Sequence, residues 1–250
     1  KLCVHWHGGK GERIPSYAGR VVQDDNTKIF SAQVWAPEKQ YEWQVGNFVS
    51  EATTPVIYEA HVGMATSLEK TGTYREFTDN TIPIIAKAGY NTIQLMAVQE
   101  HPFYGSFGYH VANFFAASSR FGTPEEFKEL VDAAHAAGLA VIIDMVHSHA
   151  VKNEVEGLAR LDGTASLYFH EGPRGHHAAW DSRCFDYGKP EVLHFLLSNC
   201  RFWLDEYRVD GFRFDGVTSM LYLHHGLGPP FASYDAYFDA AVDEDALAYL

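Results

Sequence analysis

Residues 139–149 read LAVIIDMVHSH and are the stretch that best indicates the fold of this 250-residue chain. The run from Leu139 to Val146 is apolar except for Asp144. Such runs are typical of strands in parallel sheets, which are covered on both faces. The polar residues from Asp144 to His149 then fall at the carboxyl end of the predicted strand. Parallel α/β folds place reactive side chains at these ends.

Three further strands are predicted around this run, at 56–62, 91–98 and 207–217. Helical patterns lie between the strands. Thr123 is an N-cap residue, followed by Pro124 at the first helical position and by a capping-box glutamate. Four strand–helix alternations predict parallel βα units, in either a (β/α)₈ barrel or a doubly wound sheet.

Two more helices are predicted. One begins at Pro190, and a weaker one covers 79–88. The predicted inner stripe of the Pro190 helix consists of Leu193, Leu196, Leu197, Cys200 and Leu204. The stretch 150–189 has little periodicity, and connections of this length are usually functional. We predict that it passes over an active site.

Residues 1–54 differ in texture from the rest. They are polar and rich in glycine, with short strand-like runs, and are interpreted as the tail of a β-rich module with a linker. The first residues, KLCVHWHGGKGE, lack the order of a signal peptide and an initiator Met. We therefore expect the chain to begin inside a longer protein.

The composition argues against several classes of protein. The chain has 32 acidic and 19 basic side chains, a formal net charge of −13. Such a chain repels phosphate backbones and anionic membranes, which argues against nucleic-acid and membrane-surface partners. Three scattered cysteines are too few for a disulfide framework and are predicted to be small buried apolar groups.

The pair Arg213 and Asp215 is the first candidate for chemistry. In a strand over 211–215, alternation places both on one face, with Phe212 and Phe214 on the other. An arginine there can keep the carboxylate ionised and oriented, as a nucleophilic carboxylate requires. From spacing alone, a buried structural Arg–Asp ion pair is the favoured interpretation.

The histidines at 147 and 149 allow a competing hypothesis. Two histidines at i and i+2 after a barrel strand can both ligate a metal, as in metal-dependent amidohydrolases. Such a site needs more ligands, and no candidate among Glu59, His61, Glu100 and His101 has a compelling spacing. No metal and no cofactor are predicted. Tyr104 and the run 107–110 could stack on sugar rings or simply form an aromatic core.

The blocks DMVHSH (144–149) and GFRFDGVTS (211–219) resemble signature blocks of the α-amylase superfamily of glycoside hydrolases. The surrounding sequence is similar to eukaryotic-type 1,4-α-glucan branching enzymes from Pro55 to Leu250, and more loosely before it. The blocks that carry this likeness are YEAHVG (58–63), GYNTIQLMAVQEH (89–101), SFGYHVANFFAASSRFGTPEEFKELVDAAHAAGL (106–139) and DGFRFDGVTSMLYLHHG (210–226).

The resemblance implies a fold and a site. Residues 55–250 would be the first half, about four βα units, of a (β/α)₈ barrel, and 1–54 the tail of a carbohydrate-binding β-sandwich with its linker. Asp215 would be the nucleophile that attacks an α-1,4-linked glucose, oriented by Arg213 and supported electrostatically by Asp144. The residues implied to contact the sugar are His149, Tyr109, His101 and Ser219.

The resemblance also implies a reaction and its limits. The glucosyl-enzyme would pass its chain to a glucose 6-hydroxyl of glycogen, amylose or amylopectin, in the cytosol or a plastid. The family's acid/base glutamate and a later aspartate would lie beyond Leu250, so the 250 residues alone are expected to be inactive. An α-glucan hydrolase or debranching relative, a non-catalytic glucan-binding fragment and a metal-dependent amidohydrolase are the alternatives.

Overall fold

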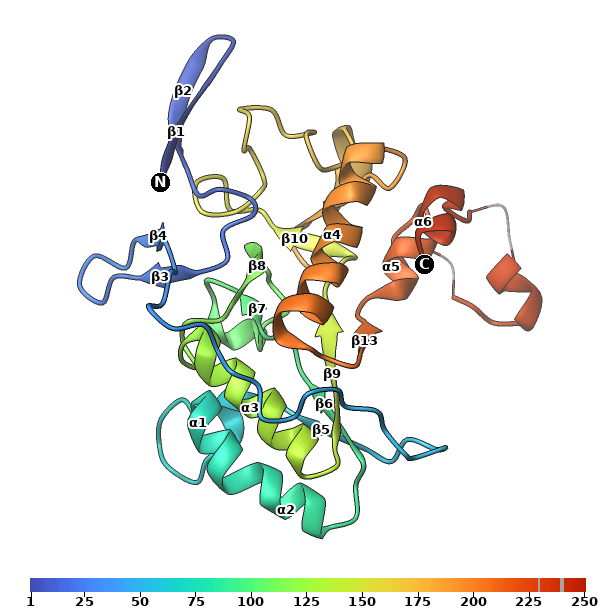
Figure 1. Cartoon of the computed structure of the whole chain (residues 1–250). Helices are drawn as coiled ribbons and strands as arrows, with labels where there is room; N and C mark the ends of the chain where they lie inside the picture. Colours follow the sequence, from blue (N-terminus) through green and yellow to red (C-terminus); the bar gives the residue numbers. More distant parts are fainter. Residues whose placement is uncertain (229, 239–240) are drawn as a thin grey trace.

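The computed structural model describes residues 1–228, 230–238 and 241–250. Its centre is a parallel four-stranded sheet in the order β13-β9-β6-β5 (Figure 1). The strands are β5 (Ile57–Ala60), β6 (Thr92–Leu95), β9 (Ala140–Met145) and β13 (Gly211–Phe214). Each lies within its predicted range, so the prediction of parallel βα units is confirmed. The strands follow one another in chain order, as in a barrel, without the reversal of a doubly wound sheet.

Helices cover one face of this sheet. The helices α1 (Tyr74–Glu76), α2 (Ile82–Lys87), α3 (Pro124–Ala136) and α4 (Pro190–Tyr207) contribute side chains to one apolar core with β6 and β9. Ile93, Val141 and Ile143 point into that core and are fully buried. The opposite face carries Glu59 and Arg213, which are both exposed.

The helix boundaries follow from their caps. Thr123 caps α3 in a capping box with Glu126, as predicted. The helix predicted at 79–88 begins earlier, because Thr73 and Glu76 form a second capping box ahead of α1. A π-helical turn, Phe77–Thr81, joins α1 to α2. Two short helices, α5 (Val217–Leu221) and α6 (Glu244–Tyr249), follow β13. The 3-10 turns are Val62–Met64, Tyr104–Ser106, Gly172–Gly175 and Tyr234–Phe238.

The predicted inner stripe of α4 is partly wrong. Leu197 is 56% exposed and Leu204 is 41% exposed. The side chains that α4 buries are instead Val192, Phe195, Leu196, Asn199, Trp203 and Tyr207. The buried face is rotated toward the aromatic side chains, because these remove more apolar area from water than leucine does.

Residues 1–54 form two separate hairpins. One pairs β1 (Leu2–Trp6) with β2 (Gly9–Arg13) and projects from the rest of the molecule (Figure 1). The other pairs β3 (Val21–Gln23) with β4 (Phe30–Ala32) and packs Val21 and Phe30 against Ala116. Their assignment to a β-sandwich module stays a prediction.

The segment after β9 forms a small antiparallel sheet of its own. Its order is β10 (His149–Val151), β12 (Ser182–Cys184), β11 (His176–His177). A further pair joins β7 (Gln99–Glu100) to β8 (Asn113–Ala117). All three thiols are free, and Cys3 is exposed, contrary to its prediction as a buried group. Among the described residues, no helix is long and apolar enough to span a membrane.

Candidate active site

The carboxyl ends of β9 and β13 bring two carboxylates onto one arginine. In the parallel register Arg213 lies opposite Asp144, so both side chains are on the same face. Arg213 Nη1 donates to Asp144 Oδ2 at 3.0 Å and to Asp215 Oδ1 at 2.7 Å. One guanidinium nitrogen therefore holds both carboxylates, which keeps them close together. The predicted Arg213–Asp215 pair is present and includes a second acid.

Asp144 is enclosed by donors. It is fully buried and also accepts hydrogen bonds from the Tyr109 hydroxyl at 2.6 Å and from Gln94 Nε2 at 2.8 Å. Burial raises the pKa of Asp144 above its ordinary value, and the hydrogen bond from Tyr109 and the charge of Arg213 oppose that shift. These contacts leave Asp144 in a supporting position rather than an open one.

Asp215 is the more accessible acid. Its side chain is 22% exposed, and that of Arg213 is 45% exposed. Phe212 and Phe214 pack against the core on the opposite face, as alternation predicts. The next residue, Gly216, has φ +68° and would place a Cβ 2.6 Å from Ser148 Oγ. A glycine is therefore needed where the chain turns away from Asp215.

His149 is held rigidly at the start of β10. Its Nε2 donates to the Tyr109 carbonyl oxygen at 2.8 Å, and its Nδ1 accepts from Ser148 Oγ at 2.9 Å. Burial lowers the pKa of His149 to about 4, so the ring is neutral at pH 7. The ring of Trp180 lies against it, with centroids 4.9 Å apart.

His147 and His149 do not converge on one point. His147 is engaged by the Tyr249 hydroxyl at Nδ1 and by Asn199 Oδ1 at Nε2. Both ring nitrogens of each histidine are thus occupied by different partners, which disfavours a shared metal ion. Within the described part of the chain, no three His, Cys, Asp or Glu side chains are grouped as metal ligands.

Two predicted sugar-contacting residues, His101 and Ser219, are buried. His101 is fully buried between the Gln99 carbonyl oxygen and Arg120 Nη1, and burial lowers its pKa to about 4. Ser219 is 4% exposed in α5. No described hydrogen bond joins either residue to Arg213 or the two acids. Tyr109 bonds Asp144 and His149 bonds Tyr109, and the sugar contacts of all four residues stay predictions.

Two residues at the site were not among the sequence candidates. Gln94 projects from β6 and donates to Asp144. The alternation of side chains along β6 could have predicted that Gln94 lies on the same face of the sheet. Trp180 borders the nucleophile candidate, because a Cβ on Gly216 would lie 3.1 Å from its ring. No local pattern marks Trp180, since it comes from the irregular excursion.

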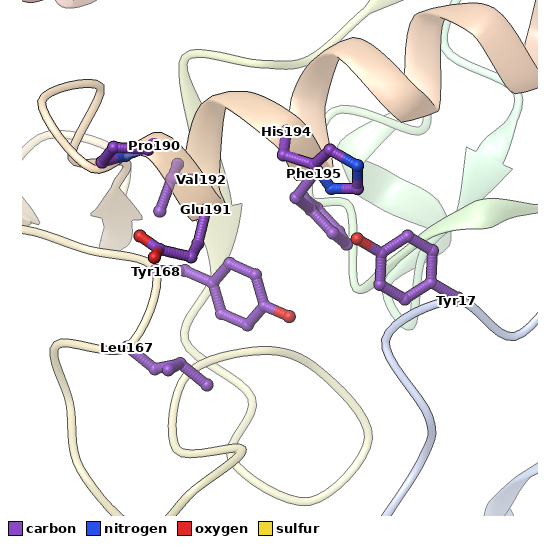
Figure 2. Close-up of a pocket in the computed structure, with 8 residues that line it drawn as sticks. All are labelled: Tyr17, Leu167, Tyr168, Pro190, Glu191, Val192, His194 and Phe195. Carbon is purple, nitrogen blue, oxygen red and sulfur yellow. The ribbon is translucent and has the colours of Figure 1, made fainter.

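A separate cavity of about 470 Å³ lies beside the start of α4. Figure 2 shows Tyr17 and Tyr168 reaching toward the first turns of α4 from two different segments. The full lining consists of Tyr17, Leu167, Tyr168, Pro190, Glu191, Val192, His194 and Phe195. Aromatic rings, one carboxylate and one imidazole thus share a mostly apolar pocket.

Comparison with known proteins places these features in a family context. Residues 64–160 match the model of the alpha amylase catalytic domain. The 1,4-alpha-glucan-branching enzyme of Dictyostelium discoideum is 56% identical over 98% of this chain and 36% of its own length. That of Aspergillus oryzae is 56% identical over 95% and 35%, and that of Equus caballus 53% identical over 100% and 36%.

A crystal structure from Salmonella typhimurium that carries an alpha amylase name superposes with a TM-score of 0.63. It is 24% identical and covers 81% of this chain and 32% of its own, which supports the fold alone. The chain spans little more than a third of the length of the curated relatives. Nearly the whole chain is thus homologous to a segment of the 1,4-alpha-glucan-branching enzymes that makes up about a third of their length. These enzymes belong to the α-amylase superfamily, and by sequence so does this chain.

Proposed function

We propose that this chain carries the nucleophile side of a glucan branching transferase. The observation that carries the proposal is the Asp215 carboxylate, partly exposed at the end of β13 and held at 2.7 Å by an arginine that also holds Asp144. A nucleophilic carboxylate must be oriented and reachable, and Asp215 has both properties. Its relatives' names supply the substrate class, an α-1,4-glucan.

The proposed reaction has two displacements. Asp215 Oδ attacks the anomeric carbon of an α-1,4-linked glucose, and the 4-oxygen of the next residue leaves with a proton from a general acid. The 6-hydroxyl of a glucose on an acceptor chain then attacks the glucosyl ester and loses its proton to the same group. The ester bond breaks, an α-1,6 bond forms, and the carboxylate of Asp215 returns. Two inversions retain the α configuration.

The surrounding residues have supporting roles in this proposal. Arg213 orients Asp215 through its hydrogen bond, and Asp144 with Tyr109 fixes Arg213 from the other side. The ring of Trp180 borders Gly216 and offers an apolar face to a pyranose, and neutral His149 packs against that ring.

The acid/base group of the reaction lies elsewhere in our proposal. A retaining mechanism needs a second carboxyl group about 5–5.5 Å from the nucleophile. Asp144 is near enough, but Tyr109, Gln94 and Arg213 occupy its oxygens. We place the acid/base group in the part of the relatives' length that this chain does not span. The four parallel strands would then be the first half of an eight-stranded barrel, with β5 and β13 as its open edges.

Branching activity tests the proposal. The complete gene product would be incubated with amylose, and α-1,6 anomeric proton signals followed with the fall in iodine absorbance. Asp215→Asn should abolish both changes. Asp205→Asn, which alters an exposed aspartate paired with Arg201, should leave them intact. New reducing ends without branches would favour a hydrolase. No activity on any α-glucan would contradict the enzyme proposal.

Glucan binding without catalysis is a second candidate function, and the aromatic pocket at α4 favours it. Tyr17 is 51% exposed and packs near Phe195, so a pyranose can stack on it without core disruption. Titration of the chain with maltoheptaose should give saturable binding that weakens about fivefold in Tyr17→Ala. Tyr234→Ala removes another exposed tyrosine and is the control. Equal maltoheptaose binding by Tyr17→Ala and Tyr234→Ala would show that this pocket does not bind glucan.

A further inference from the structure

A second, smaller cavity of about 200 Å³ lies beside the sheet β10-β12-β11. Its lining combines Lys152, Arg160 and Arg183 with one carboxylate, Glu154, and with His176. The chain as a whole has a net charge of −13. The lining of this cavity therefore carries more positive than negative charge, although the chain as a whole is acidic.

Arg183 is the unusual member of this set. It projects from β12, and among the described residues its charged neighbours include no carboxylate. Its Nη2 donates to the carbonyl oxygens of Ala165 at 2.8 Å and His170 at 3.5 Å, its guanidinium lies 5.6 Å from the centroid of the Phe169 ring, and its Nε is buried without a partner. Burial lowers the pKa of Arg183, and the nearby charge of Arg160 adds to that effect. A partly buried guanidinium with an unpaired Nε and no counter-charge is stabilised by a bound anion.

The other two cations do not compensate for this deficit. Lys152 pairs with Asp181, and Arg160 Nε pairs with Glu154 Oε1 at 3.1 Å. Asp181 and Glu154 are therefore each already paired with another cation and do not neutralise Arg183. Arg160 and Arg183 face one cavity as like charges, and an anion between them would relieve their repulsion.

We propose that this pocket binds a phosphate group, either as free phosphate or as a phosphate monoester on a sugar. Guanidinium groups bind phosphate oxygens in paired hydrogen bonds. The donors come from β12, from the residue after β10 and from the loop that contains Arg160, so they surround the cavity. A phosphate offers three acceptor oxygens and up to two charges, whereas a carboxylate offers two oxygens and one.

The pocket is linked to the candidate active site by one short strand. β10 begins at His149 and ends one residue before Lys152. The neighbouring strand β12 follows Trp180 and Asp181 directly. Phosphate bound here would tie these strands together and stabilise the excursion that carries His149 and Trp180. The proposal does not depend on the reaction assigned to Asp215.

Calorimetric titration of the full 250-residue chain with inorganic phosphate and with glucose 6-phosphate tests it, at fixed ionic strength, with glucose as the neutral control. We expect saturable binding of phosphate and a melting temperature that rises with its concentration. Arg183→Gln and Arg160→Gln should each weaken binding about tenfold, because each removes a charge-assisted hydrogen bond. Arg201→Gln, on the exposed face of α4, should bind as the parent does.

The outcomes separate cleanly. Equal affinity for inorganic phosphate and glucose 6-phosphate would mean that the pocket contacts the phosphate group alone. Tighter binding of glucose 6-phosphate would mean that the pocket also contacts the sugar. If Arg183→Gln fails to fold, the more exposed Arg160→Gln carries the test. No saturable binding by the parent, or parent-like binding by a folded Arg160→Gln, would overturn the proposal.

Discussion

The central sheet has one face packed under helices and one polar, partly exposed face (the open face), both built from alternate residues of the same strands. On the packed face, Ile93, Val141 and Ile143 are fully buried. On the open face, Gln94, Asp144 and Arg213 join in one hydrogen-bonded cluster. Strand alternation thus separates the residues that stabilise the fold from those proposed to act on substrate. Mutations on the two faces should give different phenotypes.

The largest effect is expected from Arg213→Gln on the open face. It removes the cation that both carboxylates share, so branching by the complete gene product should fall about a hundredfold or more. The urea midpoint should change little, since the side chain is 45% exposed. Arg201→Gln is the matched control, with its side chain 83% exposed on α4. A large stability loss with unchanged activity would contradict the division between the faces.

Ile143→Ala tests the packed face. It removes a fully buried side chain between β9 and the helices, so the free energy of unfolding should fall by about 2–5 kcal/mol. Urea denaturation of the chain measures it. Ile84→Ala, which changes an isoleucine 68% exposed on α2, should cost less than about 0.5 kcal/mol. Similar costs for both would mean that the packed face is not a core.

The polar end of β9 should respond to pH. Burial lowers the pKa of His147 and of His149 to about 4, below the ordinary value of 6.5. As the pH falls, these histidines are protonated in the unfolded chain before they are protonated in the folded chain. The free energy of unfolding is therefore unaffected by them above about pH 6.5 and decreases as the pH drops toward 4. Each histidine contributes up to about 1.4 kcal/mol per pH unit in that window.

His149→Gln keeps a donor and an acceptor but cannot titrate. Its free energy of unfolding should therefore fall less than that of the parent between pH 7 and pH 5. His5→Gln, at an exposed position in β1, should retain the parent's pH dependence. A slope unchanged by His149→Gln would contradict a neutral, buried ring.

The smallest effect is expected at the start of α3, which covers the packed face. Thr123 Oγ1 accepts from the Glu126 amide, so Thr123→Ala should cost about 1 kcal/mol in urea unfolding. Thr164→Ala removes a hydroxyl that bonds only to Asp162 in an exposed loop and is the control. A cost no greater than that of the control would show that this cap contributes nothing measurable.

Local patterns predicted much of the fold. The apolar run 139–146, the Thr123 capping box and Pro190 each determine structure through neighbouring residues, and all three elements formed as expected. The stripe of α4 was mispredicted at Leu197 and Leu204, because the packing of distant aromatic side chains sets which face is buried.

The site was predictable only in part, for the same reason. Arg213 and Asp215 are two residues apart, so alternation alone places them on one face. Gln94 reaches Asp144 across 50 positions of sequence, and Trp180 arrives from an irregular segment. His101 and Ser219 share sequence blocks with site residues and are buried, and their sugar contacts stay predictions.

Trapping the covalent intermediate tests the role of Asp215 most directly. A 5-fluoro-α-glucosyl fluoride carries its own leaving group, so formation of the ester does not depend on the general acid, and the fluorine slows its breakdown. Mass spectrometry of the complete gene product should show one added fluoroglucosyl unit, and peptide mapping should locate it on Asp215. The same adduct on a different carboxylate, or on a folded Asp215→Asn protein, would contradict the account.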